Sequence, residues 1–126
     1  MPVGKQLGKF DGTFSAIRVV AIGDDTRVLE GTYTATVSGE LKGTANGSMT
    51  FDGRSERGTF SDNGVGFFET GEVVNAKGQG VYWAGSQGTW EIRGAFQLGD
   101  QMVVSEGQVI LKGEEVTLTG NIYELT

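Results

Sequence analysis

The sequence predicts an all-β protein that folds as a closed or nearly closed antiparallel up-and-down β-barrel of about 8–9 strands. Glycine occurs 22 times in 126 residues, and the longest segment without it is residues 13–22. An average helix of ~11 residues therefore fits almost nowhere in the chain. Turn signals recur at even spacing, and between them apolar and polar residues alternate, which is typical of antiparallel strands with one buried face.

The turn signals set the expected elements. Asn-Gly and Asp-Gly dipeptides provide the positive φ angles that tight hairpin turns require. No linker or charge block interrupts the pattern, so residues 1–126 are expected to form a single domain of about nine strands joined in sequence. The predicted turns are Gly23-Asp24-Asp25, Ser38-Gly39-Glu40, Asp52-Gly53, Asp62-Asn63-Gly64, residues 75–78, Ala84-Gly85-Ser86, Leu98-Gly99-Asp100 and Lys112-Gly113-Glu114.

Alternation with a period of two is clearest in three segments. Residues 28–41, 88–98 and 116–122 each place apolar side chains on one face and mostly Thr, Glu or Ser on the other. Closing the sheet removes the exposed edges of an open nine-stranded sheet, so we favour a barrel, with a sandwich as the alternative. The expected inward residues are Leu29, Tyr33, Ala35, Val37, Leu41, Trp90, Ile92, Phe96, Leu98, Val116, Leu118 and Ile122.

The composition excludes several kinds of chemistry. The chain has no His and no Cys, so it has no Ser-His-Asp or Cys-His nucleophile system and no thiolate- or imidazole-bound zinc or haem. Its formal charge of −6, without clustered Lys and Arg, argues against binding nucleic acid or an anionic membrane. We expect no cofactor and no metal. No signal peptide or long apolar segment is visible, so a cytoplasmic location is expected.

Three ionisable residues occur where alternation places apolar side chains. Arg18 and Glu106 share faces with apolar neighbours, and Glu69 lies in line with Val65, although the register through Phe68 is nearly as apolar. An unpaired Glu inside an apolar barrel would have a raised pKa suited to acid–base catalysis, and an inward Arg would stabilise an oxyanion. Glu106, Glu69 and Arg18 are therefore the candidate catalytic residues. The alternative places them at a barrel mouth or in a structural ion pair.

Aromatic residues form a second group of candidates. They are expected to line a pocket for an apolar or conjugated molecule, or else to fill the core. Glycines 12, 31, 47, 94 and 120, on apolar faces, leave room either for such a molecule or for a bulky neighbour. The candidate ligand-binding residues are Tyr33, Phe67, Tyr82, Trp83, Trp90 and Met102.

Two segments resemble small bacterial barrel proteins related in fold to the allene oxide cyclase barrel. They are the run from Tyr33 to Ala45, in which a Thr-rich strand leads into Ser-Gly-Glu-Leu-Lys-Gly-Thr, and the closing run from Val116 to Leu125. The resemblance implies about eight antiparallel strands around an elongated apolar cavity. In the cyclase branch such a cavity shapes an unstable unsaturated substrate without metal or nucleotide. No catalytic motif of that branch is present here.

Three functions follow from these observations. The first is a barrel that binds a small, largely apolar or unsaturated molecule and acts as a cofactor-independent cyclase or isomerase, because steering a conformation requires shape and a few charges rather than a nucleophile. The second is a non-catalytic carrier with the same cavity. The third is a filled structural barrel that forms a homo-oligomer through an uncovered apolar face such as Val73-Val74 or Met102-Val103-Val104.

Overall fold

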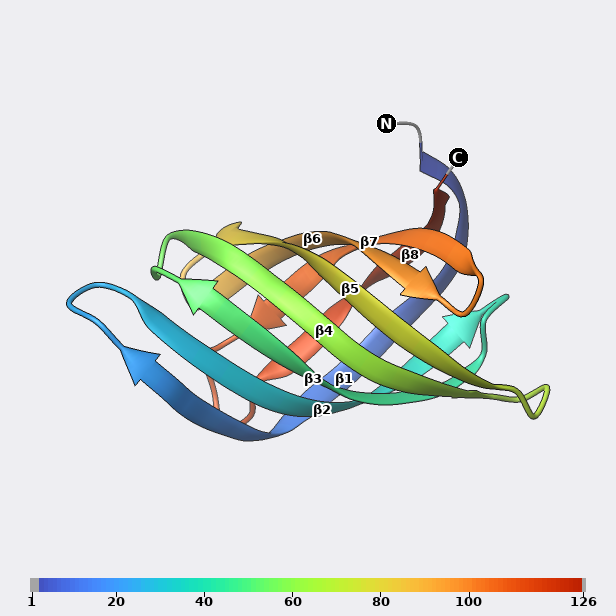
Figure 1. Cartoon of the computed structure of the whole chain (residues 1–126), viewed down its shortest axis with the longest axis horizontal. Coiled ribbons are helices and arrows are strands. Elements are labelled where there is room, and N and C mark those ends of the chain that lie inside the picture. The colour runs from blue at the N-terminus through green and yellow to red at the C-terminus, as the bar shows by residue number, and fades with distance from the viewer. Residues whose placement is uncertain (1–2, 126) are drawn as a thin grey trace.

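The protein is a closed antiparallel barrel of eight strands, described for residues 3–125 by a computed structural model (Figure 1). Each strand pairs with its neighbours in sequence, and β1 also pairs with β8, which closes the barrel. The predicted fold class is therefore confirmed. The strands are β1 (Val3–Ile22), β2 (Arg27–Gly39), β3 (Gly43–Gly53), β4 (Arg57–Phe68), β5 (Val73–Ala84), β6 (Thr89–Leu98), β7 (Gln101–Ile110) and β8 (Thr117–Leu125).

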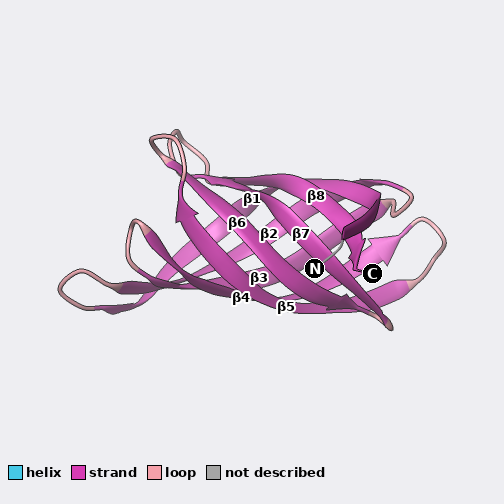
Figure 2. Ribbon diagram, turned by 90° about the horizontal axis from the view of Figure 1, so that it is seen from above, coloured by secondary structure: helices cyan, strands magenta, loops and turns pink. Residues whose placement is uncertain are grey.

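The longest strand, β1, joins the two edges of the sheet. It pairs with β2 over residues 8–22, whereas its pairing with β8 ends at Thr13. The backbone N–H of Phe14 still donates to the carbonyl of Val116 at 2.9 Å. Beyond this point the β1–β2 hairpin continues and projects past the body of the barrel, as Figures 1 and 2 show. At the opposite end, Val3 at the start of β1 pairs with Leu125 at the end of β8 (Figure 1).

The observed turns differ from the predicted ones at three places. Asp62-Asn63-Gly64 and residues 75–78 were predicted as turns, but they lie inside β4 and β5, so both predictions are wrong. The chain instead turns at residues 69–72, where Gly71 has a φ of +92°. This left-handed conformation favours glycine, and the signal Thr70-Gly71-Glu72 was missed. The barrel consequently has eight strands rather than nine.

The predicted alternation is confirmed in β2, β6 and β8. Tyr33, Ile92 and Leu118 are buried, and their neighbours on the polar face are more exposed. Several of the glycines on apolar faces lie beneath aromatic rings: a Cβ at Gly31 would come within 2.6 Å of Phe14, and one at Gly94 within 2.9 Å of Phe60. These glycines accommodate bulky side chains of the barrel interior, as the packing alternative predicted.

One end of the barrel is filled by a cluster of aromatic side chains, here called the aromatic plug: Phe14, Phe51, Phe60, Tyr82 and Trp90. Phe51 is its centre, with ring centroids 5.5–6.2 Å from those of the other four. At this range aromatic pairs add ~0.5–1.5 kcal/mol each beyond the burial of their area. The plug closes the end that carries the β1–β2, β3–β4, β5–β6 and β7–β8 connections.

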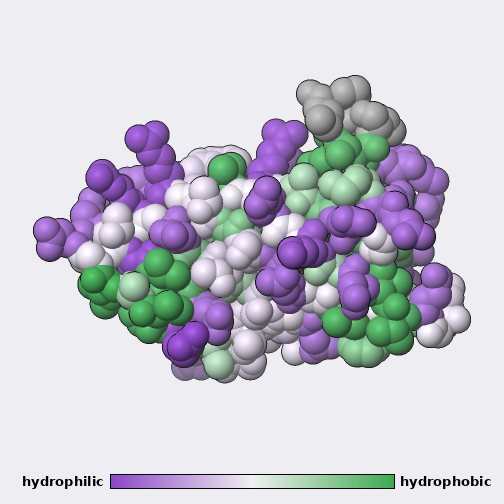
Figure 3. Space-filling view, in the orientation of Figure 1, coloured by the Kyte–Doolittle hydropathy of each residue, from purple (hydrophilic) through white to green (hydrophobic). Residues whose placement is uncertain are grey.

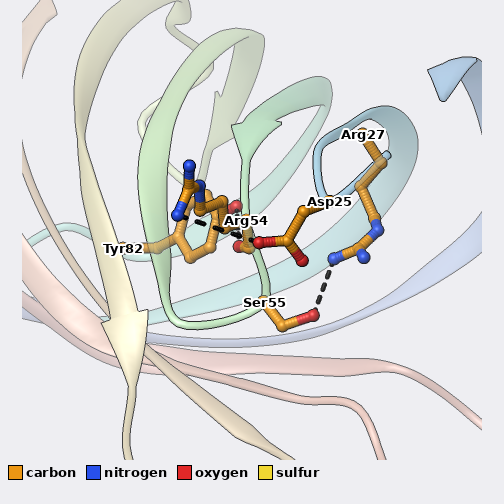
Figure 4. Close-up of polar contacts among 5 residues, drawn as sticks. All are labelled: Asp25, Arg27, Arg54, Ser55 and Tyr82. Atoms are coloured by element: carbon orange, nitrogen blue, oxygen red, sulfur yellow. Dashed lines mark hydrogen bonds and ion pairs between the residues drawn. The ribbon is translucent and has the colours of Figure 1, made fainter. Parts of the chain in front are cut away.

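Hydrogen bonds tie the plug to the β3–β4 turn. The Tyr82 hydroxyl donates to the Arg54 carbonyl at 2.6 Å, and the Trp90 indole N–H donates to the Ser55 carbonyl at 3.0 Å. Figure 4 shows how the same turn meets the β1–β2 hairpin. Arg27 donates to the Ser55 hydroxyl at 2.7 Å, and Arg54 lies 3.8 Å from the Asp25 carboxylate. This end of the barrel is thus held by both ring packing and polar contacts.

The outer surface carries some apolar side chains. Ile17, Val19, Val20 and Ile22, on the projecting end of β1, are 47–76 % exposed. Hydrophobic surface gathers at the left of Figure 3, the side on which this hairpin projects in Figure 1. Val73 is 64 % exposed, as expected for an uncovered face, but Val103 is buried inside the barrel. The expected surface formed by residues 102–104 is therefore interrupted. Within residues 3–125, no helix has the length and apolar character needed to cross a membrane.

Candidate ligand-binding cavity

The half of the barrel opposite the plug is hollow. It contains a cavity of about 110 Å³, lined by inward side chains from all eight strands. This volume is of the same order as the ~150 Å³ engineered cavity that holds benzene. The lining extends to the end where the β2–β3, β4–β5 and β6–β7 turns lie, through Leu41, Phe68 and Leu98. Most of the wall is apolar, and it includes Phe10, Ala35, Val37, Ala45, Met49, Phe60, Ala76, Ile92, Phe96, Val103, Leu118 and Ile122.

The main polar feature of the cavity is a pair formed by Tyr33 of β2 and Asp62 of β4. The Tyr33 hydroxyl lies 2.9 Å from Oδ1 and 3.1 Å from Oδ2 of Asp62, and it donates a hydrogen bond to this carboxylate. Both residues are 8 % exposed. The two strands are not neighbours, because β3 lies between them, so the Tyr33 side chain reaches across the inner face of β3.

Two glycines make this reach sterically feasible. Tyr33 pairs in register with Gly47 of β3, and Gly47 pairs with Gly64 of β4. A Cβ atom at Gly47 or at Gly64 would lie 2.7 Å from the Tyr33 hydroxyl oxygen, which is closer than real Cβ contacts. The absence of side chains at both positions therefore gives the phenol a path over β3 to Asp62.

The surroundings of the pair change its acid–base properties. Burial raises the pKa of Asp62 to about 6, and the hydrogen bond from Tyr33 opposes part of this rise. Burial also raises the pKa of Tyr33, and the neighbouring Asp62 charge and hydrogen bond act in the same direction. Tyr33 thus stays a neutral hydrogen-bond donor, while Asp62 changes its charge close to neutral pH.

This arrangement has defined chemical capabilities. An ionised carboxylate has about four lone-pair sites, and Tyr33 supplies one proton, so Asp62 retains acceptor capacity toward the cavity. A carboxyl that titrates near neutral pH is also suited to accept or return a proton. Within residues 3–125 no three His, Cys, Asp or Glu side chains gather in a way that would hold a metal ion.

The three predicted catalytic residues lie on the outer surface. Arg18 is in the projecting part of β1 and lies 3.4 Å from the Glu30 carboxylate. Glu69 is in the β4–β5 turn, 3.7 Å from Lys42 Nζ, and Glu106 is exposed on β7, where its carboxylate accepts a hydrogen bond from Tyr123 at 3.4 Å. The structure therefore brings none of the three together in the interior, and the expected inward placement of Arg18 and Glu106 is wrong.

The predicted ligand-binding residues divide into three groups. Tyr33 lines the cavity, whereas Tyr82 and Trp90 belong to the aromatic plug at the other end. The other three are on the outer surface, which corrects their expected placement. Their exposed fractions are 48 % for Phe67, 42 % for Trp83 and 44 % for Met102.

The misplaced residues have physical explanations. In β1 the pairing with β2 shifts between Phe14 and Ala16 and again between Val19 and Ala21, and such bulges break the alternation on which the placement of Arg18 rested. In β7 both registers are nearly equally apolar, so periodicity did not distinguish the face of Val103 from that of Met102. The same ambiguity affected β4, where Phe68 lines the cavity in place of Phe67.

Asp62 is the residue that sequence reasoning missed. A turn was predicted at Asp62-Asn63-Gly64, and Asp62 was not among the candidate site residues. One signal was available: Phe60 and Phe68 are eight residues apart, and alternation between them places position 62 on the same face. The turn propensity of Asp-Asn-Gly outweighed this signal.

Comparisons with known proteins support the architecture. No protein-family model matches the chain, and no curated protein matches its sequence. By structure it is similar to a protein of unknown function from Clostridium acetobutylicum ATCC 824, with a TM-score of 0.79, 12 % identity and full coverage of both chains. It is also similar to a conserved protein of unknown function from Rhodopseudomonas palustris, with a TM-score of 0.69, 12 % identity and 99 % coverage of each chain.

At this identity the likeness shows a shared fold and nothing finer. The chain therefore has the barrel architecture of these bacterial proteins. The expected relation to the allene oxide cyclase barrel stays a prediction, as does the cytoplasmic location.

Proposed function

We propose that the protein binds a small, largely apolar molecule in the cavity between the aromatic plug and the opposite end of the barrel. The observation that carries this proposal is a mostly apolar cavity of about 110 Å³ whose wall holds one buried carboxylate–phenol pair. Ligand sites are typically apolar hollows in which a few polar groups orient the bound molecule. The volume favours a molecule of about one ring, by comparison with the ~150 Å³ cavity that binds benzene.

The test is binding of benzyl alcohol, a single-ring neutral probe, followed by NMR shifts of the methyl groups of Val103 and Leu118. Both side chains line the cavity and are nearly fully buried. We expect saturable shifts at these methyls. Unchanged shifts up to the solubility limit of the probe would contradict the proposal.

A filling variant gives the control. Ala45 lines the cavity, whereas Thr44, the preceding residue of β3, is exposed on the outer face. Ala45→Phe is expected to abolish binding, and Thr44→Phe, which adds the same ring outside, is expected to leave it intact. Ala76→Phe fills the cavity from β5 and serves if Ala45→Phe does not fold. Equal binding by Ala45→Phe and Thr44→Phe would place the probe elsewhere.

A second candidate function is cofactor-free isomerisation, and it is favoured by the pKa of Asp62 of about 6. A carboxylate of this strength is suited to remove a proton from the carbon beside a carbonyl group and return it to another carbon of the same molecule. Conversion of 3-cyclohexen-1-one to its conjugated isomer, followed by ultraviolet absorbance, tests this function. Turnover should disappear in Asp62→Asn and persist in Glu106→Gln, which changes an outer carboxylate. Cyclisation, implied by the resemblance, would require an unsaturated substrate in the same site.

A further inference from the structure

The charge in the cavity is unbalanced. Of the residues that line it, Asp62 carries the one ionisable carboxylate, Tyr33 is a neutral phenol and Ser105 is neutral, and neither Lys nor Arg is among them. The described inward faces on both sides of β4 add no cation. On β3 they carry Ala45, Gly47, Met49 and Phe51. On β5 the titratable group is Tyr82, whose hydroxyl donates a hydrogen bond to the backbone carbonyl of Arg54. The ionised Asp62 therefore faces the cavity without a countercharge from this lining.

The hydrogen bonding of Asp62 is also incomplete. Within residues 3–125 the Tyr33 hydroxyl is the hydrogen-bond donor to its carboxylate, and both oxygens share that single proton. A buried carboxylate is costly when it is not paired and hydrogen-bonded. A ligand that brings a positive charge and several N–H donors would supply the countercharge and the further hydrogen bonds that the cavity lining does not give Asp62.

Aromatic rings surround the same space. Phe10, Phe60, Phe68 and Phe96 line the cavity together with Asp62. The faces of aromatic rings attract cations, with ~0.5–2 kcal/mol per contact depending on desolvation. The chain as a whole has a formal charge of −6, which attracts cations and repels anions.

We infer that the ligand is a small apolar amine, bound as its ammonium ion with the charged group on Asp62 and the apolar part among the phenylalanines of the cavity. The inference rests on the proposed function and specifies its ligand class. The Tyr33 hydroxyl holds the carboxylate in position, so that the ammonium donates to the remaining lone pairs. A neutral alcohol of the same shape donates one hydrogen bond to the carboxylate but brings no opposite charge, and an anion is repelled.

The test compares three probes of one shape: benzylamine, benzyl alcohol and benzoate, each titrated by NMR into the full chain at pH 8. An ammonium–carboxylate contact is worth about tenfold or more in affinity over a neutral hydrogen bond. We therefore expect benzylamine to bind at least about tenfold more tightly than benzyl alcohol, and benzoate to bind least. Asp62→Asn, which preserves the shape of the side chain, should remove the advantage of the amine and leave alcohol binding in place.

The pH dependence provides an independent measurement that needs no variant. Benzylamine stays protonated between pH 5 and pH 8, whereas Asp62, with a pKa of about 6, loses most of its charge over this interval as the pH falls. Benzylamine affinity should therefore fall by about tenfold on acidification, and alcohol affinity should stay constant.

The outcomes separate the two proposals. If benzyl alcohol binds as tightly as benzylamine, and Asp62→Asn alters neither, the ammonium inference is overturned while the binding function stands. If none of the three probes shifts the cavity methyls, the binding function itself fails, and the ligand class fails with it. An amine preference that disappears in Asp62→Asn or at pH 5 supports both.

Discussion

Tyr82 and Trp90 pack against each other with ring centroids 4.4 Å apart, and each donates a hydrogen bond to the backbone of the same turn. This contact joins β5, β6 and the β3–β4 turn at the closed end of the barrel. Because the rings are both buried and hydrogen-bonded, we expect this contact to be a major contributor to the stability of the fold.

The first prediction concerns the Tyr82 hydroxyl. Tyr82→Phe keeps the ring and leaves the Arg54 carbonyl without its 2.6 Å partner, so the free energy of unfolding should fall by about 1–2 kcal/mol. Trp90→Ala, which removes a whole ring, should cost about 3–5 kcal/mol. Urea denaturation measures both changes. Tyr123→Phe is the matched control, because its hydroxyl makes only a 3.4 Å exposed contact; a cost equal to that of Tyr82→Phe would contradict the role of the turn contact.

The second prediction concerns the dependence of stability on pH. Burial raises the pKa of Asp62 from its ordinary value of 3.8 to about 6, so between these values the native state binds a proton that the unfolded state has released. The contribution of Asp62 to stability is therefore largest at low pH and is lost as the pH rises through about 6. Compared with Asp62→Asn, the wild-type chain should lose about 2 kcal/mol between pH 4 and pH 7.

Urea denaturation of the two chains at a series of pH values checks this expectation. Asp52→Asn, which removes an exposed carboxylate on β3, is the control and should change far less with pH. A difference in the free energy of unfolding between wild type and Asp62→Asn that stays constant with pH would show that folding does not raise the pKa of Asp62.

The third prediction concerns the path of Tyr33 across β3. A Cβ at Gly64 would lie 2.7 Å from the Tyr33 hydroxyl, so Gly64→Ala should destabilise the barrel by about 1–3 kcal/mol. Tyr33→Phe removes the oxygen in question. In the double variant Gly64→Ala with Tyr33→Phe, the two costs should therefore overlap by about 1 kcal/mol in a double-mutant cycle. Strictly additive costs would indicate that Tyr33 does not pass over Gly64.

The fourth prediction uses two adjacent phenylalanines. Phe68 lines the cavity, and Phe67 is 48 % exposed on the outer face. Phe68→Ala should weaken the binding of benzyl alcohol by about three- to tenfold, because an aromatic contact is worth ~0.5–1.5 kcal/mol. Phe67→Ala should leave the affinity unchanged. The reverse order in the same NMR titration would mean that the strand has the opposite register.

Much of the fold was predictable from the sequence because its causes are local. Glycine spacing excluded helices, and the alternation around Tyr33, Trp90 and Leu118 identified inward faces correctly. The candidate site was less predictable because it depends on contacts distant in sequence. Tyr33 meets Asp62 across β3, 29 residues along the chain, and no local pattern specifies that contact.

The wrong turn prediction coincides with the site for a physical reason. Asp62 and Gly64 are poor residues for the middle of a strand, but one carries the carboxylate and the other gives space to the phenol. Local rules fail at these positions because contacts distant in sequence, and not strand propensity, account for the residues found there.

The barrel is packed solid at the aromatic plug and hollow in its other half, and this division has a consequence for the effects of substitutions. Side chains such as Ala45, Ala76 and Val103 border the cavity and are not part of the aromatic plug. Changing their size is therefore expected to reshape the cavity without disturbing the packed rings of the plug. Apart from Phe60, which belongs to both regions, the residues that line the cavity and those that form the aromatic plug occupy separate positions. Changes to the interior space and changes to the stability of the barrel are therefore expected to be separable by single substitutions.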